Sequence, residues 1–160
     1  MGAVTLRAMT PEEYEEWQTG VAEEYAAEQI ASGAWAADGA IERARGENDA
    51  LLPDGVATPR MLLLLGLDDD GEPVGRAWVG LDHPRGAAGV AFLYAFEIVE
   101  ERRGSGLGRA LLSAVEQATL AAGVEALELN VFGSNAPAIG LYSSSGYTVT
   151  TQQMRKPLGE

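Results

Sequence analysis

A short segment rich in glycine and arginine, ERRGSGLGRALL, has the residue types and spacing best suited to chemistry in this chain. Gly104, Gly106 and Gly108 let the backbone approach a ligand closely and adopt positive φ angles, so that several N–H groups converge on phosphate oxygens. Three of the chain's arginines lie within eight positions here: Arg102, Arg103 and Arg109. The segment indicates either an anion site of the pyrophosphate type or an ordinary turn between a strand and a helix.

Two common phosphate-binding motifs do not fit this segment. A dinucleotide fingerprint requires G-x-G-x-x-G, or alanine in the sixth place, but counting from Gly104 puts Arg109 there. A nucleotide-hydrolase P-loop requires G-x-x-x-x-G-K-[ST], and the segment has no lysine. If the segment binds pyrophosphate, the site is therefore of another kind.

The elements around the glycine segment form a strand–helix–strand unit. Hydrophobic patterning predicts a strand at about 89–98, an amphipathic helix at about 106–122 that Gly123 ends, and an alternating strand at about 125–131. Such crossovers place the two strands parallel and right-handed in nearly all proteins. The glycine segment then lies at the carboxyl end of one strand and the amino end of the helix, where ligands bind in open α/β sheets.

The rest of the chain supplies helices at the N-terminus and further strands. Thr10-Pro11-Glu12-Glu13 predicts the start of a helix that ends near Gly33, and a second helix is expected at about 35–45. A hairpin is predicted over 60–82, a short helix over 135–146 and a closing strand pair over 147–158. We therefore expect an α/β fold with one mixed sheet of about six to seven strands and about four helices, in a single domain over residues 1–160.

Composition and charge exclude several classes of protein. The chain has no cysteine and one histidine, which excludes disulfides and thiolate chemistry and makes a zinc site hard to build. That histidine, His83, precedes Pro84 and is expected to be a turn residue. The net charge of −13 disfavours nucleic acid and anionic membranes as partners. The N-terminus lacks the pattern of a signal peptide and no apolar run is long enough for a membrane span, so we expect a cytoplasmic protein without a metal.

Two motifs together resemble those of the GNAT superfamily of N-acetyltransferases. Arg103-x-x-Gly106-x-Gly108, between a strand that ends at Ile98-Val99 and an amphipathic helix, resembles the acetyl-CoA motif of that family. The second signature, N-x-x-A-x-x-L-Y-x-x-x-G-[FY], is represented by Asn135, Ala138, Leu141, Tyr142, Gly146 and Tyr147. The resemblance covers about residues 60–156 and implies a small, bacterial-type N-acetyltransferase with a single domain.

The resemblance also implies where acetyl-CoA would lie. The sheet would be splayed between the parallel strands 89–98 and 125–131, with acetyl-CoA in the gap like an extra strand. Backbone N–H groups of residues 104–109 would bind the pyrophosphate, and Ile98 and Val99 would pair with the pantetheine arm. The implied cofactor site comprises Ile98, Val99, Arg103, Gly104, Ser105, Gly106, Leu107, Gly108, Arg109, Asn135 and Tyr142.

Two of these residues have a second interpretation. Asn135 would bind the cofactor chain, or cap the last helix, or do both. Tyr142 would donate a proton to the departing thiolate, whose conjugate thiol has a pKa of about 8.5 if it behaves like cysteine. The alternative for Tyr142 is a core aromatic residue whose hydroxyl is satisfied within the protein.

Glu97 is the candidate general base. The acceptor amine must be neutral to attack, so a base or a chain of waters must take its proton. Glu97 lies on an apolar strand, where it is expected to alternate with Ala95, Leu93 and Ala91 and to face either a cleft or solvent. Many relatives have carboxylates at the positions of Ala95 and Phe96, so the identity of the base is open. The alternative is that catalysis rests mainly on the orientation of the two bound substrates. Without cysteine, the transfer is expected to be direct, in a ternary complex.

The acceptor is expected to be a primary amine of a small molecule or peptide. The glutamate-rich first helix carries three aromatic residues, Tyr14, Trp17 and Tyr25. Together with Trp35 they would line a cleft for a cationic amine. The alternative is that they pack into the core beneath a solvent-exposed glutamate face. An open strand edge near the C-terminus makes a homodimer a further expectation. Two other functions stay open: a non-catalytic acyl-CoA sensor, and a nucleotide-binding protein that uses the same loop.

Overall fold

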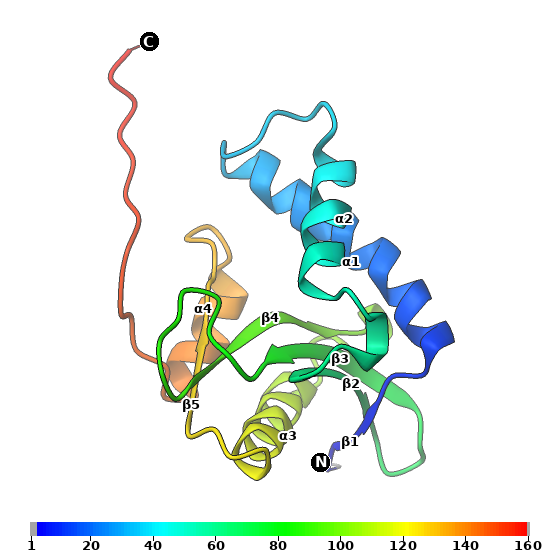
Figure 1. Cartoon of the computed structure of the whole chain (residues 1–160). Helices are drawn as coiled ribbons and strands as arrows, with labels where there is room; N and C mark the ends of the chain where they lie inside the picture. Colours follow the sequence, from blue (N-terminus) through cyan, green and yellow to red (C-terminus); the bar gives the residue numbers. More distant parts are fainter. Residues whose placement is uncertain (1–2, 160) are drawn as a thin grey trace.

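A computed structural model describes residues 3–159 and shows one twisted mixed sheet (Figure 1). Its strands are β1 (Thr5–Ala8), β2 (Met61–Leu67), β3 (Pro73–Gly80), β4 (Val90–Ile98) and β5 (Ala126–Leu129). They lie side by side in the order β1-β2-β3-β4-β5, antiparallel except for the parallel pair β4–β5. The predicted α/β architecture and the predicted parallel pair are confirmed.

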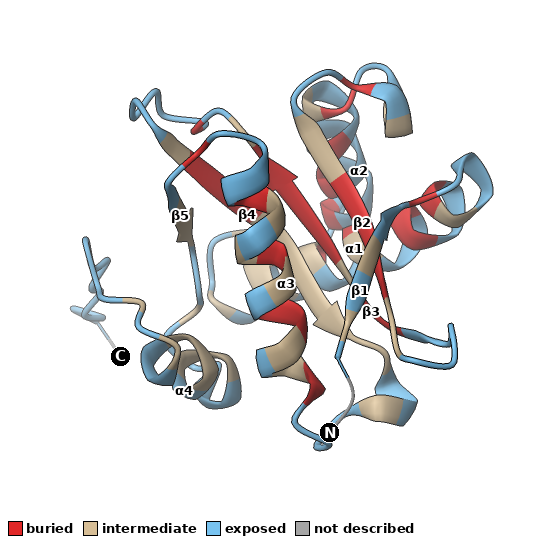
Figure 2. Ribbon diagram, turned by 90° about the horizontal axis from the view of Figure 1, so that it is seen from below, coloured by how far each residue is buried: buried red, intermediate tan, exposed pale blue. Residues whose placement is uncertain are grey.

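Helices cover both faces of the sheet (Figure 2). They are α1 (Pro11–Ala31), α2 (Ala40–Leu51), α3 (Leu107–Ala121) and α4 (Ala136–Ser144). The predicted start of α1 is confirmed, because the Thr10 hydroxyl accepts from the Glu13 N–H and the Glu13 carboxylate accepts from the Thr10 N–H. No helix within residues 3–159 is long and apolar enough to cross a membrane.

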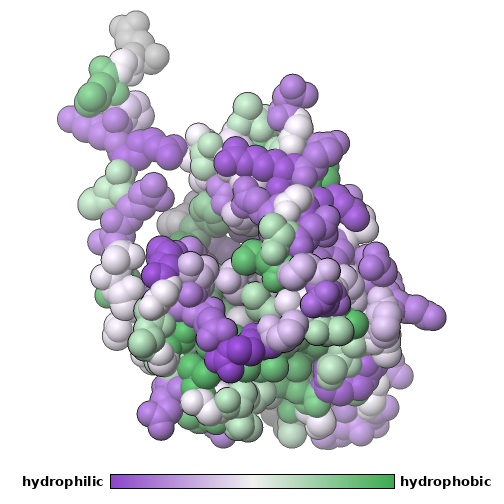
Figure 3. All heavy atoms as spheres, viewed as in Figure 1, coloured by the Kyte–Doolittle hydropathy of each residue, from purple (hydrophilic) through white to green (hydrophobic). Residues whose placement is uncertain are grey.

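The predicted closing strand pair at 147–158 is wrong. After Tyr147, residues 148–159 run as an exposed, extended segment that pairs with no strand among the described residues. The segment leaves the body of the molecule next to α4 and stands apart from it over its outer part (Figure 3). The sheet therefore has five strands over residues 3–159 rather than six or seven. A strand-like sequence forms a ladder only where a free edge lies within reach.

The second helix begins later than the sequence predicted. Gly39 precedes it with a φ of 72°, a left-handed conformation that L side chains rarely adopt. Helix α2 therefore covers residues 40–51, and Trp35 lies in the connection instead of in the helix. The Trp35 ring packs edge-on against Tyr25 of α1, with the ring centroids 5.4 Å apart.

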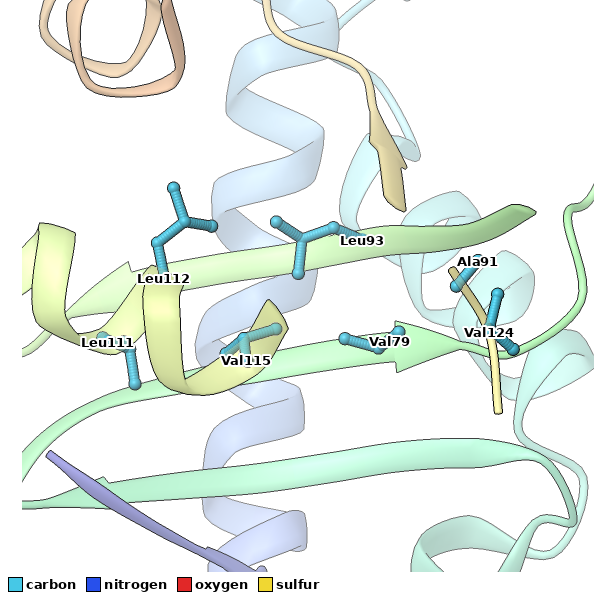
Figure 4. Close-up of a cluster of buried hydrophobic side chains, with 8 residues drawn as sticks. Val79, Ala91, Leu93, Leu111, Leu112, Val115 and Val124 are labelled. Carbon is cyan, nitrogen blue, oxygen red and sulfur yellow. The ribbon is translucent and has the colours of Figure 1, made fainter. Parts of the chain in front are cut away.

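One core lies between α3 and the sheet (Figure 4). Leu111, Leu112 and Val115 of α3 are fully buried against β3 and β4. Leu111 fits over Gly66 and Gly75, where a Cβ atom would come within 2.7 Å of its methyl groups. These two glycines of β2 and β3 let α3 approach the sheet closely, and this close packing fixes the position of the amino end of α3.

A second core lies between α1 and the opposite face of the sheet. Tyr14 and Trp17 of α1 are 6% and 3% exposed, and they pack with Trp78 of β3. The rings of Trp17 and Trp78 meet edge-on at a centroid distance of 5.8 Å. Of the two interpretations of the aromatic residues in α1, the structure therefore supports core packing for Tyr14 and Trp17.

The expected alternation along β4 is wrong because the strand contains a bulge. Trp78 of β3 lies opposite Ala95, whereas the next residue, Val79, lies opposite Leu93, so Tyr94 is the extra residue. Leu93 packs in the α3 core, but Ala95 packs in the α1 core. Two residues beyond Ala95, Glu97 therefore shares the α1 face and not the face of Leu93 and Ala91.

Candidate active site

Strands β4 and β5 stop pairing in the middle of β4. Their pairing runs from Val90 opposite Ala126 to Leu93 opposite Leu129, while β4 continues to Ile98. Within residues 3–159, the second half of β4 has no strand on its β5 side. The splay predicted between these strands is present, although β5 is shorter than the predicted 125–131.

Backbone groups at the end of β4 point alternately toward β3 and toward this open edge. The Val99 N–H donates to the Val74 carbonyl at 2.9 Å, and the Val99 carbonyl accepts from the Arg102 N–H at 2.9 Å. Because alternate residues of an antiparallel strand bond to the same neighbour, Phe96 and Ile98 direct their N–H and C=O groups to the open edge. The N–H of Ile98 and both backbone groups of Phe96 are thus placed to pair with an extended ligand. The Ile98 carbonyl already accepts from Arg103 Nε, and the N–H of Val99 is bonded to Val74.

The glycine segment forms the turn between β4 and α3. Gly104 and Gly106 have φ angles of 76° and 81°, and Gly106 is the residue that precedes the first turn of α3. No side chain caps this helix, so the N–H groups of its first turn are available to an anion. The Leu107 side chain is buried, which leaves its backbone as the part that a ligand could contact.

Gly108 has a different reason to be glycine. A Cβ atom at this position would lie 3.6 Å from Leu141 Cδ2 and 3.9 Å from Ile98 Cγ1, which are ordinary contact distances. Its φ is not positive either. The fold therefore tolerates a small side chain at residue 108, and the absence of one keeps the space before the first turn of α3 open.

The arginines and the serine of this segment make bonds that shape it. Arg102 Nη1 lies 2.9 Å from Asp68 Oδ2 in the β2–β3 turn, and Arg103 Nε donates to the Ile98 carbonyl at 3.0 Å. The Ser105 hydroxyl donates to the Arg102 carbonyl. Arg109 reaches the end of α4, where its guanidinium donates to Ser144 and Ser145 at 2.7 and 3.1 Å. The sequence predicted neither these bonds nor their partners.

Tyr142 projects from α4 toward the open edge of β4. Its ring packs against Phe96 at a centroid distance of 6.3 Å and against Tyr147 at 5.8 Å. Burial, and then the nearby charge of Glu28, raise the pKa of Tyr142 to about 12. The hydroxyl therefore keeps its proton at neutral pH, as a proton donor must.

Asn135 caps α4, which confirms one of its two expected roles. Its Oδ1 accepts from the Ala138 N–H at 3.2 Å. Asn135 also borders a cavity of about 90 Å³ between the end of α1 and the β5–α4 connection. The lining residues are Glu28, Ala31, Ser32, Phe132, Ser134 and Asn135.

Glu28 is the one titratable side chain in the lining of this cavity, and sequence reasoning missed it. Burial, and then the charge of Glu24 one turn earlier on α1, raise the pKa of Glu28. Its own charge in turn raises the pKa of Tyr142, so the carboxylate and the phenol belong to one electrostatic environment. A signal existed in the sequence: Glu24 and Glu28 are like charges at i,i+4, a spacing that destabilises a helix.

Glu97 is held by a partner on the neighbouring strand. Its Oε1 lies 3.1 Å from Arg76 Nη1, and both side chains are little more than a quarter exposed. The charge of Glu97 contributes, after burial, to the raised pKa of Glu24 on α1. Glu97 thus faces α1, but its carboxylate neutralises an arginine.

His83 lies in the turn after β3, as expected. Its Nδ1 accepts from the Arg85 N–H at 3.0 Å, so Nε2 bears the hydrogen and donates to Glu128 of β5, also at 3.0 Å. The ring therefore fastens the β3–β4 connection to β5, at the opposite end of β4 from the glycine segment. Within residues 3–159, no three side chains of the metal-ligating types are grouped to bind an ion.

Comparison with known proteins places this geometry in a family. The family model described as "Acetyltransferase (GNAT) family" matches residues 42–147. The uncharacterized N-acetyltransferase YdgE of Bacillus subtilis is 33% identical over 98% of this chain and 99% of its own length. Mycothiol acetyltransferase of Clavibacter michiganensis is 35% identical over 60% of this chain but only 31% of its own length.

A solved structure matches the whole fold. The crystal structure of the putative acetyltransferase YycN from Bacillus subtilis is 31% identical, covers 99% of this chain and 100% of its own, and superposes with a TM-score of 0.91. The sequence of YycN matches as well, with 31% identity over 97% of this chain and 99% of its own length. The chain belongs to the GNAT family of acetyltransferases.

Proposed function

We propose that this protein transfers the acetyl group of acetyl-CoA directly to a primary amine, in a ternary complex. The observation that supports this best is the convergence of three features at one end of β4. These are an unpaired strand edge, an uncapped helix start with two left-handed glycines, and a half-buried tyrosine. The strand edge suits the amides of a pantetheine arm, and the helix start suits a pyrophosphate. The tyrosine suits a departing thiolate, which needs a proton.

The end of β4 and the start of α3 offer backbone groups that acetyl-CoA would need. Phe96 and Ile98 would pair with the amides of the pantetheine arm, and the N–H groups of residues 104–109 would bind the pyrophosphate. The space kept free at Gly108 matches the approach of a phosphate to the first turn of α3. We retain Ile98 in this role and transfer the role first given to Val99 to Phe96, since the N–H of Val99 is bonded to Val74.

Tyr142 is proposed as the general acid. The nitrogen of the acceptor forms a bond to the acetyl carbonyl carbon, the C–S bond breaks, and the electron pair of that bond leaves on sulfur. A phenol whose pKa is about 12 is fully protonated during turnover and donates its proton to the sulfur. Tyr142→Phe is expected to lower kcat by about 100-fold or more while acetyl-CoA binding is retained.

Glu28 replaces Glu97 as our candidate for the group that receives the acceptor's proton. Glu28 lines the cavity, shares an electrostatic environment with Tyr142 and makes no ion pair among the described residues. A raised carboxylate pKa brings a base closer to the working pH. Glu97 is then assigned to orienting Arg76. Glu24 and Glu28 of α1 give this face an acidic character, which favours a cationic acceptor.

One observation favours the alternative of a non-catalytic acyl-CoA sensor. The carboxylate that the sequence offered as a base, Glu97, is bonded to Arg76. A chain without any base would bind acetyl-CoA but release no CoA when amines are added. The two functions are therefore separated by turnover and not by binding.

The experiment has two stages. First, the melting temperature of the protein is measured with acetyl-CoA, CoA, ATP and NAD. A ligand at 100-fold excess over its Kd stabilises the folded protein by about 2.7 kcal/mol, which raises the melting temperature of a protein of this size by roughly 5–10 °C. We expect a shift with acetyl-CoA and CoA alone. Thiol release is then followed with polyamine, amino-acid, aminoglycoside and peptide amines. A shift without release supports the sensor, a shift with ATP alone supports a nucleotide-binding protein, and no shift at all contradicts both acyl-CoA proposals.

We propose that residues 1–160 act as one N-acetyltransferase domain, because every element contributes to one sheet or covers it. We propose that the protein works in the cytoplasm. We also propose that the protein forms a homodimer.

A further inference from the structure

The carbonyl of Ile98, which faces the open edge of β4, is covered by a side chain of the glycine segment. Arg103 Nε donates to this carbonyl at 3.0 Å. A carbonyl oxygen accepts two hydrogen bonds, so the bond itself leaves a place for a second donor. The bulk of the guanidinium does not, because neighbouring extended chains run only about 4.7–4.9 Å apart. A group seated on this carbonyl therefore stands where a ligand paired with β4 would run.

Arg103 is held more loosely than its neighbour Arg102. The Arg102 guanidinium is paired with Asp68, whose side chain is 15% exposed and also accepts from the N–H groups of Asp70 and Glu72. Arg103, in contrast, is exposed, and its side chain makes no ion pair among the described residues. Its hydrogen-bond partner is a neutral carbonyl. Of these two arginines, Arg103 is the one that can change its partner at little cost.

Arg103 also lies between the two halves of the proposed cofactor site. It directly precedes Gly104, where the turn that would bind the pyrophosphate begins, while its guanidinium reaches back to the end of β4. Burial, and then the charge of Glu97, raise the pKa of Glu24 on α1, and the charge of Arg103 opposes this rise. A hydrogen bond from a guanidinium to a phosphate is charge-assisted and stronger than one to a neutral carbonyl. A pyrophosphate at the glycine turn therefore competes with Ile98 for this side chain.

We propose that Arg103 couples the two halves of acetyl-CoA, because it covers the Ile98 carbonyl in the free protein and uncovers it when a pyrophosphate binds the guanidinium. This inference rests on the proposed use of acetyl-CoA. One hydrogen bond is exchanged for another: the guanidinium moves from the carbonyl to a phosphate, and an amide N–H of the pantetheine arm donates to the vacated carbonyl. Arg103 is then a specificity-determining residue, which favours the complete cofactor over thioesters that lack the nucleotide.

The coupling acts in both directions. If a bound pyrophosphate makes the edge of β4 accessible to the arm, the arm must favour pyrophosphate binding by the same factor. Pantetheine carries the arm without the phosphates, and phosphoadenosine diphosphate, the nucleotide half of CoA, carries the phosphates without the arm. We expect each to raise the affinity of the wild-type chain for the other by about 10-fold, which is within the range common for coupled sites.

Titration calorimetry of the full chain with CoA, pantetheine and phosphoadenosine diphosphate tests this coupling. Arg103→Met removes the guanidinium and keeps an unbranched apolar stem. The variant should bind pantetheine about 10-fold more tightly than wild type does, and phosphoadenosine diphosphate should no longer raise that affinity. Its affinity for CoA should stay the same or fall, because the phosphate loses its guanidinium. Arg45→Met, at an exposed position of α2, is the matched control and should behave as wild type with all three ligands.

Two simpler roles of Arg103 give different results in this experiment. If Arg103 only binds phosphate, Arg103→Met weakens the binding of CoA and leaves the binding of pantetheine unchanged. If Arg103 only stabilises the turn, the variant binds both ligands more weakly. Either result overturns the coupling while the proposed function stands. Failure of the wild-type chain to bind CoA would overturn the coupling and the proposed function together.

NMR spectroscopy follows the exchange directly. The Nε–H resonance of Arg103 is assigned by its absence in Arg103→Met. It should shift when phosphoadenosine diphosphate alone is added, because the Nε–H leaves the Ile98 carbonyl. A resonance that stays unchanged at saturation with this nucleotide would contradict the exchange. Neither readout needs an acceptor amine or turnover.

Discussion

Arg109 Nη2 lies 2.7 Å from Ser144 Oγ, so the first turn of α3 is bonded to the end of α4. One side chain therefore links the helix that would receive the pyrophosphate to the helix that presents Tyr142. Arg109 acts in the free protein as a positioning residue, and its charge is shared with two serine hydroxyls.

Removal of this bond should affect turnover more than binding. In Arg109→Ala we expect kcat to fall by about 10- to 100-fold, because small displacements of a reacting group are costly, while the KM for acetyl-CoA changes by much less. Arg45→Ala removes an exposed arginine of α2 and serves as the control. An equal loss in both parameters would assign Arg109 to cofactor binding instead, and an unchanged kcat would remove it from positioning.

Gly108→Trp tests the cofactor loop. A Cβ atom here would lie at ordinary contact distance from Leu141 and Ile98. A large side chain is expected to fill the space that the pyrophosphate would need at the first turn of α3. Gly108→Trp is expected to abolish the thermal shift with acetyl-CoA. Gly46→Trp, at a helical glycine of α2 with open surroundings, is the matched control. A normal shift in Gly108→Trp would place the pyrophosphate elsewhere.

Local signals in the sequence predicted most of the fold. The capping box at Thr10 and the glycine at residue 123 are local features that fix helix ends, and both acted as expected. The bulge at Tyr94 and the unpaired C-terminal segment were not predictable in this way. A bulge depends on how a strand packs against its neighbour, and a ladder depends on which edge lies within reach. The hydrophobic pattern of a single segment therefore determines neither property.

The sequence predicted the parts of the site that are formed by local backbone conformation. It did not predict the side chains that come from distant parts of the chain. Gly104 and Gly106 indicated left-handed turns from their residue type alone, and both have them. Glu28 becomes part of the site only because α1 ends beside the β5–α4 connection, more than 100 residues later in the chain. For the same reason, the partner of Glu97 on β3 could not be named from the sequence of β4.

Glu28→Gln is expected to lower the turnover rate and to raise the thermal stability at neutral pH. Because the folded-state pKa of Glu28 is raised above 4.5, its charge costs stability once the pH exceeds that folded-state pKa. The variant is therefore expected to melt higher than wild type at pH 7 and equally at pH 4, while its kcat at pH 7 falls by about 100-fold. Glu23→Gln, at an exposed position of the same helix, should change neither. Full activity in Glu28→Gln would exclude this carboxylate as the base.

The contribution of Glu13 to the free energy of unfolding has the opposite dependence on pH. Hydrogen bonds first from Arg7 and then from the Thr10 N–H lower the pKa of the Glu13 carboxyl from 4.5 to about 2. A lowered folded-state pKa stabilises the protein fully above the unfolded value, and this contribution is lost as the pH falls from about 4.5 to about 2. The bonds tie β1 to the start of α1, with the two Arg7 nitrogens 2.7 and 2.8 Å from the carboxylate.

Urea unfolding of Glu13→Gln measures this contribution. At pH 7 we expect a loss of about 1 kcal/mol, within the range for a capping residue and kept small because the ion pair is partly exposed to solvent. The difference between variant and wild type should shrink as the pH falls below 4.5. Glu12→Gln, which changes an exposed glutamate in the same helical turn, should show neither the loss nor its pH dependence. A difference that stays constant from pH 7 to pH 2.5 would mean that the amide, and not the missing charge, destabilises the helix start.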